Sequence, residues 1–230
     1  MQKKLGILGG MGPMATVDFM RRIVVKSPAT CDQEHIPMII SNNPTTPDRT
    51  TCILHQGADP IDVLLKDLDN LKQAGATKVV IPCNTAHHWL EKLSNRGVEF
   101  ISIIDSVLNA AQEKKMQRIG IMATDATIKI NLYRQGILDR GLEPLQPDEQ
   151  GQAQVMEGIL AVKAGNIAKG RELMAPIFDQ LIADGADGVI LGCTEIPLAF
   201  DDFSEQKKQR ALDSLDLLAE QCVNYYYYQA

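Results

Sequence analysis

The chain has 230 residues, enough for one large domain or two small ones that each bury a hydrophobic core. Its formal net charge is −6, from 23 Lys and Arg against 29 Asp and Glu, and no basic run stands out. These features argue against binding to nucleic acid or to an anionic membrane and favour a small-molecule ligand. Five cysteines with no C-x-x-C pair argue against a disulfide framework and a zinc site.

The first residues begin like a signal peptide, with two lysines ahead of an apolar run. Glycines at positions 6, 9, 10 and 12 interrupt that run, and no later stretch is apolar for the length that a membrane-spanning helix needs. We therefore expect a cytoplasmic protein with no membrane partner.

Short apolar runs alternate with helical patterns along the chain. The predicted strands of the first half are 4–9, 36–41, 78–82 and 98–104, and the helices between them are 14–25, 60–73 and 85–93. The pattern restarts at 118, with predicted helices at 126–140, 149–163 and 167–184, a strand at 188–191, and a last helix at 211–224. The strand expected just before that last helix is short or missing. The final residues, N-Y-Y-Y-Y-Q-A, are interpreted as a frayed helix end in preference to an aromatic patch that packs on a neighbour.

This alternation predicts the α/β class, with mainly parallel sheets flanked by helices. A-G-A-T-K-V-V-I-P-C at 74–83 resembles D-G-A-D-G-V-I-L-G-C at 184–193, which indicates two similar, pseudo-symmetric domains. The predicted domains are 1–101 with 209–230, and 102–208, so that the C-terminal helix completes the first. Ligands of such sheets bind at the carboxyl ends of the strands, and the active site is expected in the cleft between the domains.

Cys83 and Cys193 end the two similar stretches, each at the carboxyl end of a predicted strand. The polar pairs that follow them, Asn84-Thr85 and Thr194-Glu195, suit the start of a helix. A helix N-terminus lowers the pKa of a nearby thiol, so we expect each cysteine to exchange between thiol and thiolate. Two such groups on opposite faces of a tetrahedral carbon can remove and return a proton. That reaction is racemisation without a cofactor.

The alternative is that both cysteines are ordinary core residues, because cysteine is among the residue types most often buried. A single strand-end cysteine would be interpreted in that way. A repeated pair with polar residues behind each member favours catalysis.

Six motifs stand in order between Gly6 and Glu195: G-I-L-G-G-M-G-P, N-N-P-T-T-P-D-R-T, P-C-N-T-A-H, A-T-D-A-T-I, V-K-A-G-N and G-C-T-E. In them the chain resembles the aspartate/glutamate racemase family, most of all its cofactor-independent aspartate racemases. The resemblance implies an amino-acid substrate, aspartate or also glutamate, with no cofactor and no metal. It implies Cys83 and Cys193 as paired acid and base, Cys193 serving the L enantiomer and Cys83 the D enantiomer. A homodimer is also expected.

The resemblance places Arg49 and Lys163 at the carboxylates of the substrate, where a dicarboxylate beside a thiolate needs positive charge. The glycine-rich turn at 9–12 lets the backbone approach the ligand. The expected substrate contacts are Met11, Gly12, Arg49, Asn84, Thr85, Ala86, Thr124, Thr127, Lys163, Thr194 and Glu195. The competing interpretation is that the cations are ordinary surface residues and that the Asn and Thr side chains only cap helices. For His87, an orienting role and a purely structural role stay open.

Two departures from the glutamate racemases favour aspartate. Glu195 stands where those enzymes carry a histidine, and Gly9-Gly10 replaces their Asp-Ser pair. The alternatives that stay open are a glutamate or broad-specificity amino-acid racemase, a maleate-isomerase-like enzyme of the same superfamily, and a non-catalytic amino-acid binding protein.

Overall fold

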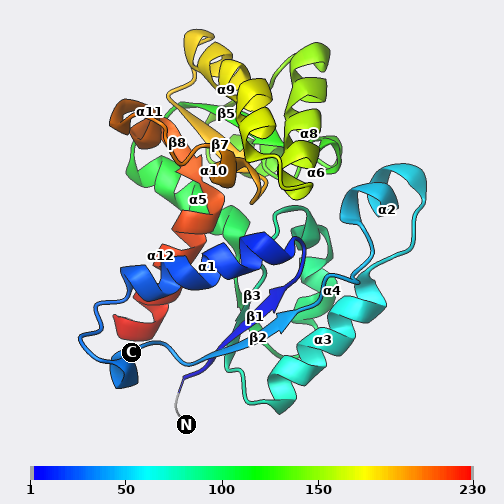
Figure 1. Ribbon diagram of the computed structural model, residues 1–230, viewed down its shortest axis with the longest axis vertical. Coiled ribbons are helices and arrows are strands. Elements are labelled where there is room, and N and C mark those ends of the chain that lie inside the picture. Colours follow the sequence, from blue (N-terminus) through cyan, green and yellow to red (C-terminus); the bar gives the residue numbers. More distant parts are fainter. Residues whose placement is uncertain (1–2, 229–230) are drawn as a thin grey trace. The chain divides into compact units, whose positions relative to one another are not determined.

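The structure, a computed structural model, describes residues 3–228. It contains two four-stranded sheets in which all neighbouring strands run parallel, each flanked by helices (Figure 1), so the predicted α/β class is confirmed. The chain divides into two compact units: one runs to Ser106 and resumes at Leu215, and the other is Val107–Ser214. The domain boundaries drawn from the sequence stay a prediction.

The first unit holds a sheet with strand order β2-β1-β3-β4. Its strands are β1 (Leu5–Gly9), β2 (Met38–Asn42), β3 (Lys78–Val80) and β4 (Glu99–Ile101). Its helices are α1 (Pro13–Lys26), η1 (Asp32–Glu34), α2 (Arg49–His55), α3 (Ile61–Gln73), η2 (Thr85–Trp89), α4 (Leu90–Ser94), the start of α5 (Ile103–Glu113) and most of α12 (Ser214–Tyr227).

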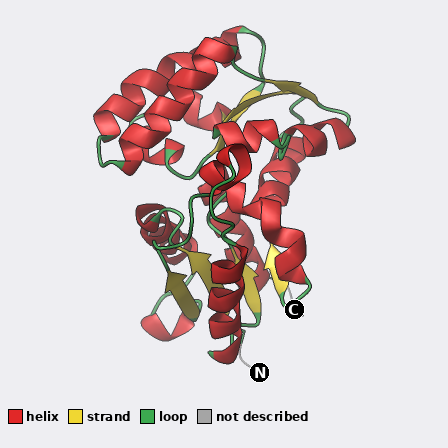
Figure 2. Ribbon diagram, turned by 90° about the vertical axis from the view of Figure 1, so that its right-hand side faces the viewer, coloured by secondary structure: helices red, strands yellow, loops and turns green. Residues whose placement is uncertain are grey.

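Side chains of β1 alternate between two cores, as the period of two in a strand requires. Leu5 and Ile7 pack with α1 and α12, whereas Leu8 packs with α3 on the other face of the sheet. All five residues of β1 are buried, because the strand lies inside a sheet that helices cover on both faces (Figure 2).

The second unit repeats this plan with strand order β6-β5-β7-β8. Its strands are β5 (Arg118–Ala123), β6 (Glu143–Leu145), β7 (Gly188–Gly192) and β8 (Ala211–Asp213). Its helices are the rest of α5, α6 (Asp125–Lys129), α7 (Arg134–Asp139), α8 (Glu149–Lys163), α9 (Ile167–Ala183), α10 (Ile196–Ala199) and α11 (Glu205–Arg210). The helices α8 and α9 pack against β5 and β7 to form the main core of this unit.

The two sheets are related strand by strand. β1 and β5 hold the same place in their sheets, and so do β3 and β7, the strands that precede Cys83 and Cys193. The internal similarity of the sequence therefore corresponds to a repeated topology.

Several predicted elements are wrong in extent. Between the strand predicted at 36–41 and the helix predicted at 60–73 the structure has a further helix, α2, because the Asp48 side chain accepts a hydrogen bond from the N–H of Thr51 and caps it. The strand expected to run to 104 ends at Ile101, and α5 follows. The single helix expected at 126–140 is broken, since Asn131 adopts φ of 54° and ends the turn after α6.

At the C-terminal end, the last strand is short, as predicted, and α12 begins at Ser214 rather than at 211. The interpretation of the tyrosine tail as a frayed end is wrong for residues 225–227, and Gln229 and Ala230 lie outside the described residues. Tyr226 and Tyr227 pack on the core of the first unit, and the Tyr227 hydroxyl donates to the Glu34 carbonyl at 2.7 Å. The Tyr225 ring carries the ammonium groups of Lys3 and Lys78 over its faces at 4.9 and 4.2 Å.

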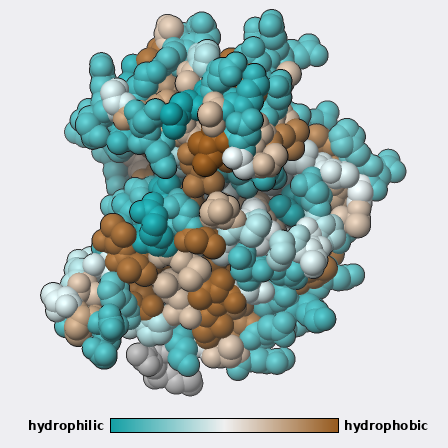
Figure 3. Space-filling model, in the orientation of Figure 1, coloured by the Kyte–Doolittle hydropathy of each residue, from teal (hydrophilic) through white to brown (hydrophobic). Residues whose placement is uncertain are grey.

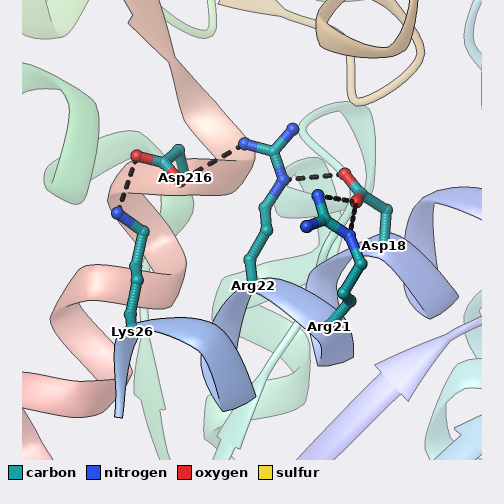
Figure 4. A network of polar contacts seen from close by, with 5 residues as sticks. All are labelled: Asp18, Arg21, Arg22, Lys26 and Asp216. Carbon is teal, nitrogen blue, oxygen red and sulfur yellow. Dashed lines mark hydrogen bonds and ion pairs between the residues drawn. The ribbon is translucent and has the colours of Figure 1, made fainter. Parts of the chain in front are cut away.

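A network of ion pairs joins α12 to α1 (Figure 4). Asp18 pairs with Arg21 and Arg22 at 2.8 and 2.7 Å, and Asp216 pairs with Arg22 and Lys26 at 3.4 and 2.9 Å. Arg22 thus contacts a carboxylate on each helix, which links the two ends of the chain within the first unit.

The outer face of α1 is largely apolar, with Arg21 as an exposed charged residue among its hydrophobic side chains, and brown side chains lie along it in Figure 3. Met14, Val17, Val24 and Val25 are the exposed large hydrophobic residues of this helix. The expected homodimer stays a prediction.

Among residues 3–228, no helix combines the length and the apolar character that crossing a membrane would take.

Candidate active site

Cys83 is a free, buried thiol just beyond the end of β3, with 6% of its surface exposed. Its backbone N–H donates to the carbonyl of Ile81 at 2.7 Å, so the chain turns sharply as it leaves the sheet. Within the described part of the chain, the Cys83 sulfur has no hydrogen-bond partner. It belongs to the same hydrophobic core as Met11 and Ala86, so these three predicted site residues lie in one core of the first unit.

The helix expected behind Cys83 is a five-residue 3₁₀ helix, η2, followed by the short α4. Asn84 and Thr85 at its start are buried and hydrogen-bonded or otherwise paired. So short a 3₁₀ helix has a much smaller dipole than the α-helix that was expected to act on the thiol.

His87 fixes the backbone of this turn. Its Nδ1 lies 2.9 Å from the Cys83 carbonyl, and the backbone N–H of Ile103 donates to its Nε2 at 3.1 Å. Since Nε2 accepts a hydrogen bond, Nδ1 carries the proton and the ring is neutral. Burial lowers the pKa of His87 to about 4, which agrees with a neutral ring. The structure thus supports an orienting role through the Cys83 carbonyl.

The glycine-rich turn after β1 is held in a conformation that requires glycine. Gly10 has φ of 91°, and a Cβ there would collide with the backbone of Asn43. The Gly10 N–H donates to the Thr16 hydroxyl at 2.9 Å. Gly12 is the N-cap residue of α1, and Met11 is buried in the core to which Cys83 also belongs.

Arg49, the first residue of α2, is not a surface residue, since only 7% of its surface is exposed. Its Nη1 donates to the carbonyls of Thr46 and Pro47 at 3.1 and 2.9 Å, and its Nε has no hydrogen-bond partner. Within residues 3–228, no carboxylate forms an ion pair with it. The interpretation of Arg49 as half of a surface ion pair is therefore wrong.

Cys193 is the corresponding free, buried thiol after β7, also 6% exposed. Its sulfur lies 2.9 Å from Oε2 of Glu195, and the Thr194 hydroxyl lies 3.4 Å from the same oxygen. The helix behind it, α10, has only four residues.

The expected lowering of the Cys193 pKa is wrong. Burial, followed by the negative charge of Glu195, raises the pKa of this thiol well above its usual range, while the positive charge of Lys163 acts in the opposite direction. Lys163 is the last residue of α8 and is exposed, so it acts on Cys193 from the end of that helix. In the second unit, Cys193 and Thr194 thus contact the Glu195 carboxylate, and the charge of Lys163 acts on the same thiol.

Thr124 directly follows β5, the neighbour of β7, and Thr127 lies in the helix α6 that begins there. The Thr124 hydroxyl donates to that of Thr127 at 3.0 Å and accepts from its N–H, so it caps α6. This observation supports the capping interpretation for Thr124. A contact of either threonine with a substrate stays a prediction.

Sequence reasoning missed Tyr133. It is 1% exposed, and both burial and the Cys193 charge raise the pKa of its phenol. A Cβ on Gly192 would lie 3.1 Å from the Tyr133 ring, so the ring packs against the residue before Cys193. No sequence pattern connects positions 133 and 193. Across residues 3–228, no three or more His, Cys, Asp or Glu side chains are grouped as a metal site would need.

The comparisons with known proteins agree with this fold, which is that of the two-domain α/β racemases. A solved structure, the aspartate racemase of Picrophilus torridus, superposes with a TM-score of 0.88 at 27% identity and covers 97% of this chain and 94% of its own. The broad-specificity amino-acid racemase RacX of Bacillus subtilis is 25% identical over 96% of this chain and 97% of its own length. A glutamate racemase of Shewanella denitrificans is 27% identical over 59% of this chain and 49% of its own.

The model of the Asp/Glu/Hydantoin racemase family matches residues 8–222. The chain belongs to this family, and the family's substrates include amino acids.

Proposed function

We propose that this chain is a cofactor-independent aspartate racemase, in which the thiols of Cys83 and Cys193 exchange protons with the α-carbon of the substrate. The observation that supports this most is the equivalent position of two free thiols. Each is buried at the end of the strand that pairs with the first strand of its sheet. Core packing alone does not require a cysteine at the same strand end of both sheets.

The chemistry needs one thiolate and one thiol, each reaching the same α-carbon from its own side. The thiolate forms an S–H bond with the α-proton, and the electron pair of the broken C–H bond stays on the α-carbon. That pair then takes the proton of the second thiol, whose S–H bond breaks to leave a thiolate. The configuration is inverted, and the two sulfurs have exchanged roles. The family resemblance assigns Cys193 to the L enantiomer and Cys83 to the D enantiomer.

Arg49 supports a substrate with more than one carboxylate. A buried cation normally has an anionic partner, because removing an unpaired charge from water costs several kcal/mol, on the order of its lost hydration. Arg49 has only two backbone carbonyls and an unsatisfied Nε. A substrate carboxylate would supply the missing acceptor, and Lys163 offers a second cation whose charge acts on Cys193. Aspartate has two carboxylates and thus suits two cations.

The second candidate is a broad-specificity amino-acid racemase, which the likeness to RacX over almost the whole chain favours. Circular dichroism of the enantiomers of aspartate, glutamate and alanine distinguishes the two. An aspartate racemase abolishes the aspartate signal with much the highest kcat/KM, whereas a broad-specificity enzyme acts on alanine at a similar rate. Binding of aspartate without decay of the signal would mean a non-catalytic binding protein.

The same assay tests the absence of a cofactor. We expect racemisation to persist after dialysis against a chelator and treatment with a carbonyl reagent, because neither removes a thiol. Loss of activity in a protein that is still folded would contradict the two-thiol reaction. The proposal includes a cytoplasmic homodimer, for which light scattering gives the mass in solution.

A further inference from the structure

The two strand-end thiols differ in one respect that their topology does not predict. The Cys193 sulfur lies 2.9 Å from Oε2 of Glu195, and both residues are buried. The Cys83 sulfur has no polar partner within residues 3–228. One thiol therefore has a carboxylate in hydrogen-bond contact, and its counterpart has none.

The surroundings of Glu195 direct its carboxylate to the sulfur. Its Oε2 accepts from the Cys193 thiol and lies 3.4 Å from the Thr194 hydroxyl. Its own backbone N–H donates to the Cys193 sulfur, and the Lys163 charge also favours a thiolate at that position. A carboxylate in this position would repel the carboxylates of a substrate. Direct binding of the substrate by Glu195, as the sequence predicts, is therefore unfavourable.

We propose that Glu195 is the proton acceptor of Cys193, an inference that rests on the proposed racemase function. In the first step the Cys193 S–H bond breaks and its proton forms an O–H bond with Glu195, which leaves a thiolate and a carboxylic acid. The thiolate then takes the α-proton of the substrate, and Cys83 donates its own proton to the opposite face. Glu195 afterwards releases its proton to water, and the Cys83 thiolate takes one from water, which restores both groups.

This relay explains how a buried thiol next to a carboxylate can act as a base. Burial and the Glu195 charge hold the pKa of Cys193 well above its usual range, so the thiol is the resting form. Proton transfer to Glu195 removes the negative charge of the carboxylate at the moment at which the thiolate forms. The net charge of the pair is −1 before and after the step, so no additional buried charge is created.

The test compares Glu195→Gln with wild type. Glutamine keeps the size and a carbonyl oxygen that accepts the thiol hydrogen bond, but it cannot take the proton. We expect kcat to fall roughly 10²–10⁴-fold, as for loss of a positioned acid–base group, with little change in KM. Because the equilibrium constant of racemisation is one, kcat/KM must fall equally from L- and from D-aspartate. Glu195→Asp, which retains a carboxylate on a shorter side chain, should recover part of the loss.

A second measurement separates this role from a structural one. The rate at which iodoacetamide alkylates Cys193 is followed against pH, with the modified peptide identified by mass spectrometry. Removal of the Glu195 charge in Glu195→Gln should shift the alkylation profile to lower pH, while racemisation falls. The exposed Glu149→Gln, in the first turn of α8, is the matched control and should change neither quantity.

Each result is decisive. Racemisation that stays near the wild-type rate in Glu195→Gln, or a loss confined to KM, would overturn the relay. An unshifted alkylation profile would show that the thiol and the carboxylate are not coupled. If Glu195→Gln does not fold, the test passes to Glu195→Asp. A folded Glu195→Asp whose alkylation profile or pH–rate profile equals that of wild type would overturn the relay. A wild-type protein that racemises no amino acid would overturn the proposed function as well, whereas an active wild type with unaffected Glu195 variants would overturn the relay alone.

Discussion

Nδ1 of His87 lies 2.9 Å from the carbonyl oxygen of Cys83, and through this contact a neutral imidazole holds the turn that presents a strand-end thiol. The other ring nitrogen accepts from the N–H of Ile103 at the start of α5. A protonated ring would lose this second bond, because Nε2 would become a donor facing a donor.

This contact predicts a pH dependence of stability. Burial lowers the pKa of His87 to about 4 from 6.5. Its neutral form is therefore favoured in the folded state. The resulting stabilisation is fully present above the unfolded pKa and is lost as the pH falls from that value towards about 4; a shift of this size corresponds to about 3 kcal/mol. Urea unfolding of wild type and His87→Gln should differ at neutral pH, and the difference should shrink by that amount on acidification.

The exposed His55→Gln is the control for this measurement. Its free energy of unfolding should follow that of wild type at every pH. A difference between wild type and His87→Gln that is constant with pH would mean that the ring is not held neutral in the folded protein.

Arg49 gives a second prediction, on substrate affinity against stability. Arg49→Met should lower kcat/KM for aspartate by roughly 10–100-fold, the value of one or two hydrogen bonds to a charged group. Stability should fall by no more than about 1 kcal/mol, because the variant loses two hydrogen bonds to backbone carbonyls but also removes the cost of burying a cation without an ion pair. Steady-state kinetics and urea unfolding measure the two effects. Unaltered kinetics for L-aspartate would contradict the carboxylate assignment.

The exposed Arg96→Met serves as the matched control for loss of a positive charge in the same unit. It should leave both kcat/KM and stability close to wild type. An equal loss in both variants would point to long-range attraction of an anionic substrate instead of a contact with Arg49.

The ion pairs between α1 and α12 give a third prediction, on stability alone. Asp216→Asn removes the carboxylate that Arg22 and Lys26 share. Because Asp216 is 38% exposed, the loss should be modest, about 0.5–1 kcal/mol, and should diminish at high salt. Urea unfolding with and without added salt measures it. The exposed Glu220→Gln on the same helix should show no such effect, and a salt-independent loss in Asp216→Asn would mean that packing is responsible.

The sequence predicts the features that depend on short-range patterns. The apolar runs before Cys83 and Cys193 are buried strands, and their similarity corresponds to equivalent positions in two sheets. The C-terminal strand is short because only Leu212 of A-L-D is fully buried in the sheet. These features follow from side-chain periodicity, which operates over a few residues.

Features that depend on side-chain conformation or on distant packing were not predictable. The carboxylate of Glu195 turns back to Cys193 through a short turn, and sequence spacing gives no rotamer. Tyr133 comes under the influence of Cys193 because its ring packs against Gly192, far along the chain. The run of tyrosines at the end of the chain does not by itself indicate which surface it covers. In the structure Tyr226 and Tyr227 pack on the core of the first unit, and Tyr227 also donates a hydrogen bond to a backbone carbonyl. Tyr225 lies under the ammonium groups of two lysines.

The fourth prediction tests the two-thiol reaction itself. If one thiol removes the α-proton and the other returns a proton, the group that returns it is never the one that took it. In heavy water the product should therefore carry deuterium at the α-position from its first appearance, while the remaining substrate gains deuterium more slowly. Proton NMR of L- and D-aspartate, incubated separately, follows both species.

Serine in place of either thiol is a far weaker acid and base of similar size, so Cys83→Ser and Cys193→Ser should each lose racemisation by roughly 10²–10⁴-fold and still fold. Each variant keeps one thiol, and any residual α-deuterium exchange should therefore favour one enantiomer: L in Cys83→Ser and D in Cys193→Ser, if the assignment from the family resemblance holds. The exposed Cys31→Ser should racemise like wild type. Near wild-type racemisation by a folded Cys83→Ser or Cys193→Ser would mean that the cysteine concerned is a core residue of its strand end and no catalyst, because no alcohol at that position could supply the proton transfer at the same rate.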